Sequence, residues 1–318
     1  MPIRFAPAVM SLFGLGLAWR TFVETSGMIP GFGMLMSIGS VLLGLITLGS
    51  ILFHQLGSGV SKETWKNPQL RVLPAALLVG LMLLAGLLAP HMPTLARILI
   101  WVAALSHLLL LAVLFQKWLE GEVPIDTLTP VWFIAWVGSI VVPVGAVPVG
   151  EIALAWFAFS IGFLLWLALM PVVLYRLIIS KAMPPELEAT LLILVAPPAI
   201  GAVSWSLLAG AEYPALGVMM LSLAFFFTCA LLPMMLRVFS RPVVPANWAF
   251  GFPLAALSSA LAIYSALLEL RALWIASTVV LVVGLTHARL TNQNRIIFST
   301  TLQHLNRTTN LIVTTNHR

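Results

Sequence analysis

The sequence predicts an all-α membrane protein with ten transmembrane helices. Of its 318 residues, 61% are hydrophobic and 8% are charged, whereas soluble domains carry about 25% charged residues. The apolar runs continue from near Phe5 to Leu290, and Gly, Pro and Ser residues fill most of the breaks between them. A helix needs about 20 residues to cross a bilayer, and the runs divide into ten segments of roughly that length.

The ten expected spans, numbered one to ten in chain order, cover residues 5–23, 31–54, 72–90, 94–116, 130–147, 150–175, 187–209, 214–236, 246–268 and 271–290. The least marked boundary separates spans five and six, where almost no polar residue lies between Val147 and Gly150. Residues 1–290 are therefore expected to form one transmembrane domain. Residues 291–318 are rich in Asn and Thr and are expected to form a weakly ordered cytoplasmic tail.

The distribution of Lys and Arg predicts that both termini face the cytoplasm. With ten spans, Arg20, Arg97 and Arg271 fall on the outer side and the other 13 of the 16 basic residues fall on the inner side. Cytoplasmic loops of membrane proteins carry such an excess of basic residues. Membrane orientation thus explains the net charge of +6 without a nucleic-acid partner. We expect an integral, multi-pass protein of a bacterial inner (cell) membrane.

Helix-breaking residues favour the odd-numbered spans. Examples are Gly14 in span one, Pro74 in span three, Pro143 in span five, Pro198 in span seven, and Gly251 and Pro253 in span nine. Proline removes a backbone donor, and interrupted backbone is tolerated in lipid only where protein covers it or where it lines a watery cavity. We therefore expect five helical hairpins with the odd helices inside. We expect Phe252 to face that interior, either as a packing residue or as a residue that lines a transport path.

The middle of every span lacks fixed charge. No Asp, Glu, Lys or Arg lies there, although proton-coupled carriers and pumps usually place ionisable residues mid-membrane. Only His107 occupies such a position, and a lone intramembrane His serves as a packing residue or as a proton relay. The sequence offers no nucleophile paired with a base, no phosphate loop, no metal cluster and no matching second His for haem. The sequence therefore gives little support for an enzymatic function or for a bound cofactor.

The intramembrane hydroxyls are those of Ser139, Ser204, Ser206, Ser258 and Ser259, and Ser139 and Ser258 are the candidate pore-lining hydroxyls among them. Each hydroxyl either bonds to the carbonyl one helical turn earlier or lines the path of an anion as a weak donor. A path without fixed charge suits a channel better than a high-affinity carrier, because conduction requires binding weak enough to let the ion leave.

Four segments also carry a resemblance to a known family. They are GLGLAWR at 14–20, WFIAWVGSIVVP at 132–143, LVAPPA at 194–199 and NWAFGFPLAA at 247–256. With their order and spacing, the chain over about residues 5–290 resembles the tellurite-resistance/dicarboxylate transporter family. That family includes the bacterial TehA proteins, the plant guard-cell slow anion channels and the fungal malate permeases.

The resemblance implies a homotrimer in which each subunit has its own pore. It implies five helical hairpins around a quasi-fivefold axis, and a phenylalanine on span nine that closes the pore, which is Phe252 by motif position. The glycines and prolines named above would then shape the lumen. Ala135 stands where the family often has proline, so the bend in span five is expected to rest on Pro143 alone.

We therefore predict a passive transmembrane channel for small inorganic or organic anions, without a cofactor, gated by Phe252. The alternative is a secondary carrier or efflux protein for C4-dicarboxylates, sulfite or tellurite. The alternative outside transport is a membrane enzyme or a haem-binding subunit.

Overall fold

The computed structural model describes residues 3–27, 30–58, 65–121, 124–210, 212–240 and 245–283. Within these ranges all regular secondary structure is helical. Seven described helices are long and apolar enough to cross a membrane, and three shorter apolar helical segments accompany them. The protein is therefore an all-α, multi-pass membrane protein. The expected tail at 291–318 lies outside the described residues.

The helices follow the expected spans closely. Spans one to four correspond to α1 (Ala6–Ser26), α2 (Pro30–Ser58), α4 (Pro74–Leu88) and α5 (Pro93–Leu119). Span five is divided into α6 (Trp132–Trp136), η3 (Gly138–Val141), α7 (Val142–Ala146) and η4 (Val147–Val149). Spans six to nine correspond to α8 (Ile152–Ile179), α9 (Ala196–Ala209), α10 (Ala215–Phe239) and α11 (Gly251–Leu267). The segment Arg271–Val283 corresponds to span ten.

The expectation that the bend in span five rests on Pro143 alone is wrong. The first α-helical part already ends at Trp136, and the chain continues from Gly138 as the 3-10 turn η3 before Pro143 is reached. The absence of proline at Ala135 therefore does not restore a continuous helix.

Side chains from neighbouring helices satisfy the carbonyl groups that this broken span leaves free. The Nε2 atom of His107 on α5 lies 3.3 Å from the carbonyl oxygen of Ile134. The hydroxyl of Ser204 on α9 donates to the carbonyl oxygen of Ile140 at 2.6 Å. Because lipid offers no water for such groups, these bonds allow an irregular segment to lie inside the membrane domain.

Spans one, three, seven and nine begin irregularly, span five becomes irregular after the short helix α6, and all five continue as α-helix from a turn that contains proline. The 3-10 segments η1 (Ile3–Phe5), η3, η5 (Glu188–Val195) and η6 (Pro245–Phe250) precede α1, α7, α9 and α11, and a turn precedes α4. The prolines in these first turns are Pro7, Pro74, Pro143, Pro197, Pro198 and Pro253. A first-turn residue has no intrahelical partner for its N–H, so proline is tolerated there. The expected prolines Pro74, Pro143, Pro198 and Pro253 thus lie in the first turns of α-helices, whereas Gly14 lies inside the continuous helix α1.

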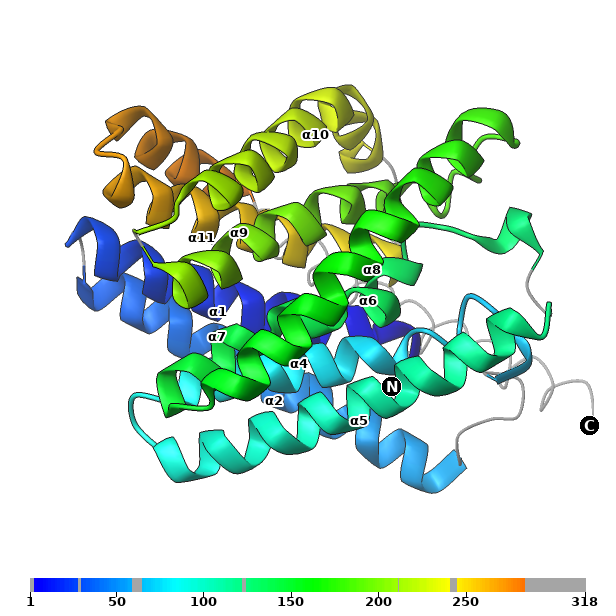
Figure 1. Ribbon diagram of the computed structural model, residues 1–318, viewed down its shortest axis with the longest axis horizontal. Coiled ribbons are helices and arrows are strands. Elements are labelled where there is room, and N and C mark those ends of the chain that lie inside the picture. The colour runs from blue at the N-terminus through cyan, green and yellow to red at the C-terminus, as the bar shows by residue number, and fades with distance from the viewer. Residues whose placement is uncertain are drawn as a thin grey trace, which may run out of the picture.

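The odd spans form the interior of the molecule. The most apolar stretches of spans one, seven and nine have 72% to 89% of their residues buried, against 22% to 39% in spans two, four, six and eight. Contacts link α1 to α4, α4 to α7, α7 to α9, α9 to α11 and α11 back to α1, which is a closed circuit. The long helices α5, α8 and α10 slant in the same general direction across the molecule (Figure 1).

The ends of the odd spans gather at the left end of Figure 1, next to the starts of the even spans that follow them. Gly27, Gly150 and Gly210 adopt positive φ angles of 64°, 82° and 60° in three of the turns between them. Glu269 takes the equivalent position in the turn before Arg271, with a φ of 55°. The marked turn at Gly150 also confirms the weak boundary between spans five and six.

Candidate functional site

A small apolar cavity, which we call the neck, lies where all five odd spans meet. Its wall includes Met10 of α1, Val79 of α4, Ile134 of α6, Ile193 of η5 and Phe252 of α11. The cavity measures about 30 Å³, which is room for about one water molecule. An ion in such a space would lose its hydration shell and find almost no polar atoms in exchange.

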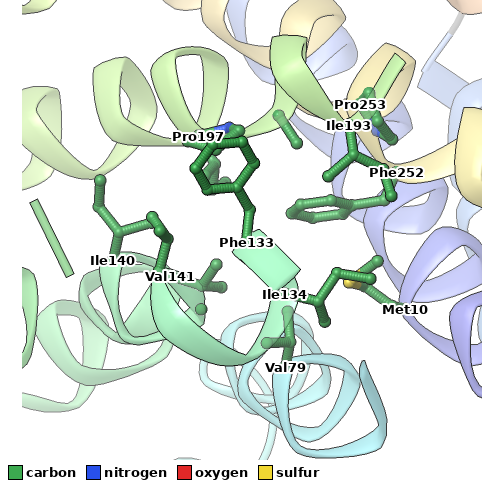
Figure 2. A pocket seen from close by; sticks show the side chains of 14 residues that line it. Met10, Val79, Phe133, Ile134, Ile140, Val141, Ile193, Pro197, Phe252 and Pro253 are labelled. Carbon is green, nitrogen blue, oxygen red and sulfur yellow. The ribbon is translucent and has the colours of Figure 1, made fainter. Parts of the chain in front are cut away.

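The ring of Phe252 projects into the neck, toward Phe133 and Ile134 (Figure 2). Only 5% of Phe252 is exposed. Its ring lies against α1, where a Cβ atom added at Gly14 would lie 3.0 Å from the ring atom Cδ2. Gly14 therefore provides the space that the ring occupies.

The backbone beside Phe252 is held close to α1. A Cβ atom added at Gly251 would lie 2.6 Å from the Cβ atom of Ser11. The Ser11 hydroxyl donates to the carbonyl oxygen of Trp248 at 2.8 Å. Glycine thus permits the close approach of α11 to α1, and the serine fixes the 3-10 segment that leads into it.

A larger cavity with several polar lining residues, which we call the vestibule, adjoins the neck. It measures about 390 Å³ and shares Ile134 and Ile193 with the neck. The irregular starts of the odd spans form its wall. The polar residues among them are Arg4, Asn67, Gln69, Thr129, Glu186 and Thr190. The vestibule therefore has room and polar groups for water, so an ion in it can remain hydrated.

The two predicted hydroxyls lie outside the walls of the neck and the vestibule. Ser139 is fully buried, and a Cβ atom added at Gly162 of α8 would lie 2.7 Å from its hydroxyl oxygen. The Ser258 hydroxyl lies 3.1 Å from the hydroxyl of Ser277 in the last described helix. Ser258 thus joins spans nine and ten.

The predicted kink residues divide between the wall and the layer behind it. Pro253 lines the neck beside Phe252. In span seven the lining residue is Pro197 rather than the adjacent Pro198. Pro74 and Pro143 lie in the first turns of α4 and α7 and are not part of the neck wall.

His107 is buried behind the neck and does not line it. A carbonyl oxygen only accepts hydrogen bonds, so Nε2 of His107 carries the proton shared with Ile134. A Cβ atom added at Gly138 would lie 2.5 Å from Nε2, so that glycine makes room for the imidazole. Among the described residues, no three His, Cys, Asp or Glu side chains cluster as metal ligands.

Sequence reasoning missed most of the neck wall, including Met10, Val79 and Ile193. Each is an ordinary apolar residue in an apolar span, so hydrophobicity does not distinguish it. The motif around residues 132–143 did contain Phe133 and Ile134, and proximity to broken helix positions was the available signal for both.

Residues 1–291 match the family model SLAC1, described as a voltage-dependent anion channel. The match takes in all ten expected spans and leaves out the tail. No significant match to the chain occurs among curated proteins.

Proposed function

Because this chain belongs to the voltage-dependent anion channel family, we propose that it conducts small anions passively and that Phe252 closes its pore. Membership implies anion transport rather than enzymatic catalysis. The observation that carries the finer proposal is the position of the Phe252 ring in an apolar neck to which every odd span contributes. An aromatic ring across a narrow apolar passage closes it both sterically and by excluding water.

The proposed architecture is a ring of ten helices, arranged as five hairpins around a quasi-fivefold pore. The closed circuit of contacts among the odd spans and the exposure of the even spans support it. In this arrangement Gly14, Gly251 and the prolines Pro74, Pro143, Pro198 and Pro253 set the path of the inner helices. Ser139 and Ser258 would act as lining hydroxyls only in a conformation that brings them to the lumen, since both are buried behind it.

The neck wall contains no lysine or arginine that would hold an anion too tightly, which is compatible with conduction.

We propose both termini in the cytoplasm of a bacterial cell membrane and a homotrimer with one pore per subunit. The vestibule then opens to the cytoplasm, because it lies at the starts of the odd spans. This orientation rests on the excess of Lys and Arg at that end of the spans.

A secondary carrier or efflux protein for C4-dicarboxylates, sulfite or tellurite is the second candidate. The neck and the vestibule would suit a channel or a carrier. However, the neck wall contains no titratable residue for proton coupling. Planar-bilayer recording with chloride, nitrate, sulfite and malate separates the two. Channel function requires a current that reverses at the equilibrium potential of the anion. Flux that depends strictly on a proton gradient would establish a carrier instead.

A further inference from the structure

The wall of the vestibule carries charges of both signs. Among its described lining residues, Arg4 is the basic one and Glu186 is the acidic one. Both residues are exposed, and neither has an ion-pair partner within the part of the chain that the structure describes. A carboxylate at the entrance of an anion path repels the ions that the path carries. Glu186 therefore acts against anion entry, and it does so next to a group that favours entry.

Glu186 lies on a turn whose backbone is held by hydrogen bonds. The N–H group of Leu187 donates to the carbonyl oxygen of Pro184 at 2.9 Å. The hydroxyl of the buried Thr190 donates to the carbonyl oxygen of Leu187 at 2.6 Å. The same segment continues as η5 to Ile193 in the neck wall. The Glu186 side chain thus starts from a fixed point on the vestibule wall, on a segment that leads to the neck.

Basic groups near the vestibule favour anions of higher charge. A neighbouring cavity of about 520 Å³ shares Gln69, Thr129 and Leu187 with the vestibule, and the exposed Lys181 lines it. The attraction between a basic group and an anion grows with the charge of the anion. Arg4 and Lys181 would therefore draw in divalent anions more strongly than monovalent ones. Glu186 reduces this preference.

We propose that Glu186 determines specificity by valence: it hinders the entry of divalent anions, such as sulfate or a dicarboxylate, more than that of monovalent anions, such as chloride or nitrate. This inference rests on the proposed channel function and narrows its substrate class to small monovalent anions. Two unit charges about 7 Å apart in water change an entry rate roughly two- to threefold. A dianion has twice the interaction energy, so its fold-change is about the square of that for a monoanion.

The test records currents of the full-length protein in phosphatidylcholine bilayers, with Phe252→Ala as the conducting background. At an ionic strength of about 20 mM, Glu186→Gln should raise the current in sodium nitrate roughly twofold and in sodium sulfate roughly fourfold. Arg4→Gln should lower the same currents by similar factors. At about 0.5 M all these changes should nearly vanish, because salt screens exposed charges. Both variants should fold, because each replaces an exposed side chain without an ion-pair partner in the described residues.

Two control variants separate charge from shape and from location. Glu186→Asp keeps the carboxylate and should leave the ratio of sulfate to nitrate current unchanged. Glu120→Gln removes an exposed carboxylate at the end of α5, outside the vestibule wall, and should also leave the ratio unchanged. Each variant is compared with Phe252→Ala in the same salt, so the difference in hydration between nitrate and sulfate cancels.

Equal fold-changes for nitrate and sulfate in Glu186→Gln would overturn the inference, and so would a gain that persists at high salt. Either result in a conducting protein leaves the channel proposal intact. Absence of current from every variant would overturn the channel proposal. Anion flux into vesicles then decides the inference by the same ratio, because Glu186 acts on entry before a channel and a carrier differ. A protein that passes no anion in either assay ends both proposals, so the two failures are distinguishable.

Discussion

The ring of Phe252 fills the space left by the missing side chain of Gly14. A Cβ atom at Gly14 would lie 3.0 Å from Cδ2 and 3.7 Å from Cε2 of that ring. The first distance is tighter than ordinary van der Waals contact, so α1 sets a limit on where the ring can rest. Span one and span nine thus determine the state of the neck together.

Replacing Phe252 with alanine should raise anion conductance about tenfold or more, because removing even ~1.4 kcal/mol from the barrier to ion passage gives a factor of ten. Bilayer recording of equal amounts of wild-type and variant protein measures the change. Phe250→Ala is the matched control. Phe250 is fully buried, packs against Phe239 with ring centroids 5.5 Å apart and does not line the neck. Equal currents from Phe252→Ala and wild type would count against the gate.

Replacing Gly14 with alanine should change the basal current severalfold, because the added methyl group forces the Phe252 ring away from its resting position in the neck. In the Phe252→Ala background the same change should have almost no effect, because the ring it pushes on is gone. A double-mutant cycle on conductance measures this coupling. Additive effects of the two substitutions would show that Gly14 acts elsewhere.

Replacing His107 with leucine should leave transport largely intact and lower stability. The substitution removes the only described donor to the Ile134 carbonyl, and an unsatisfied buried polar group costs about 1–3 kcal/mol. Thermal unfolding and anion flux into vesicles separate the two effects. Ser204→Ala removes the donor to Ile140 in the same broken span and should behave alike. Loss of flux from His107→Leu with normal folding would assign that histidine a direct role in transport.

The helices were predictable because each span is a long apolar run bounded by turn residues. At Gly150, a single glycine with a positive φ separates two spans although almost no polar residue lies between them. The interior position of Phe252 was also predictable, since the glycine and proline beside it require cover from protein.

The sequence did not predict which side chains contact each other between helices, or which parts of a span adopt 3-10 geometry. Nothing in the sequence near Ser258 indicates that Ser277 faces it, because that contact depends on the relative rotation of two helices. The 3-10 segment Glu188–Val195 has no composition that separates it from an apolar α-helix. The neck wall combines residues as distant in sequence as Met10 and Ile193, so only the assembled circuit of helices defines it.

The turns that follow the odd spans offer a test of backbone strain that is independent of conduction. Glu269 has a φ of 55°, in the left-handed region that glycine occupies at Gly27, Gly150 and Gly210 in the equivalent turns. A residue with a Cβ atom is disfavoured there by about 1–2 kcal/mol. Glu269→Gly should therefore raise the midpoint of thermal unfolding, although the greater freedom of glycine in the unfolded chain offsets part of the gain.

Gly150→Ala is the converse control for this strain. The φ at Gly150 is 82°, and a Cβ atom there meets nothing within 4 Å, so the substitution introduces strain without a clash. It should lower stability by about 1 kcal/mol. Opposite shifts of the two variants in the same detergent would establish that left-handed backbone in the turns after the odd spans is a shared requirement. A loss of stability in Glu269→Gly would instead show that the Glu269 side chain stabilises the folded protein by more than its left-handed backbone destabilises it.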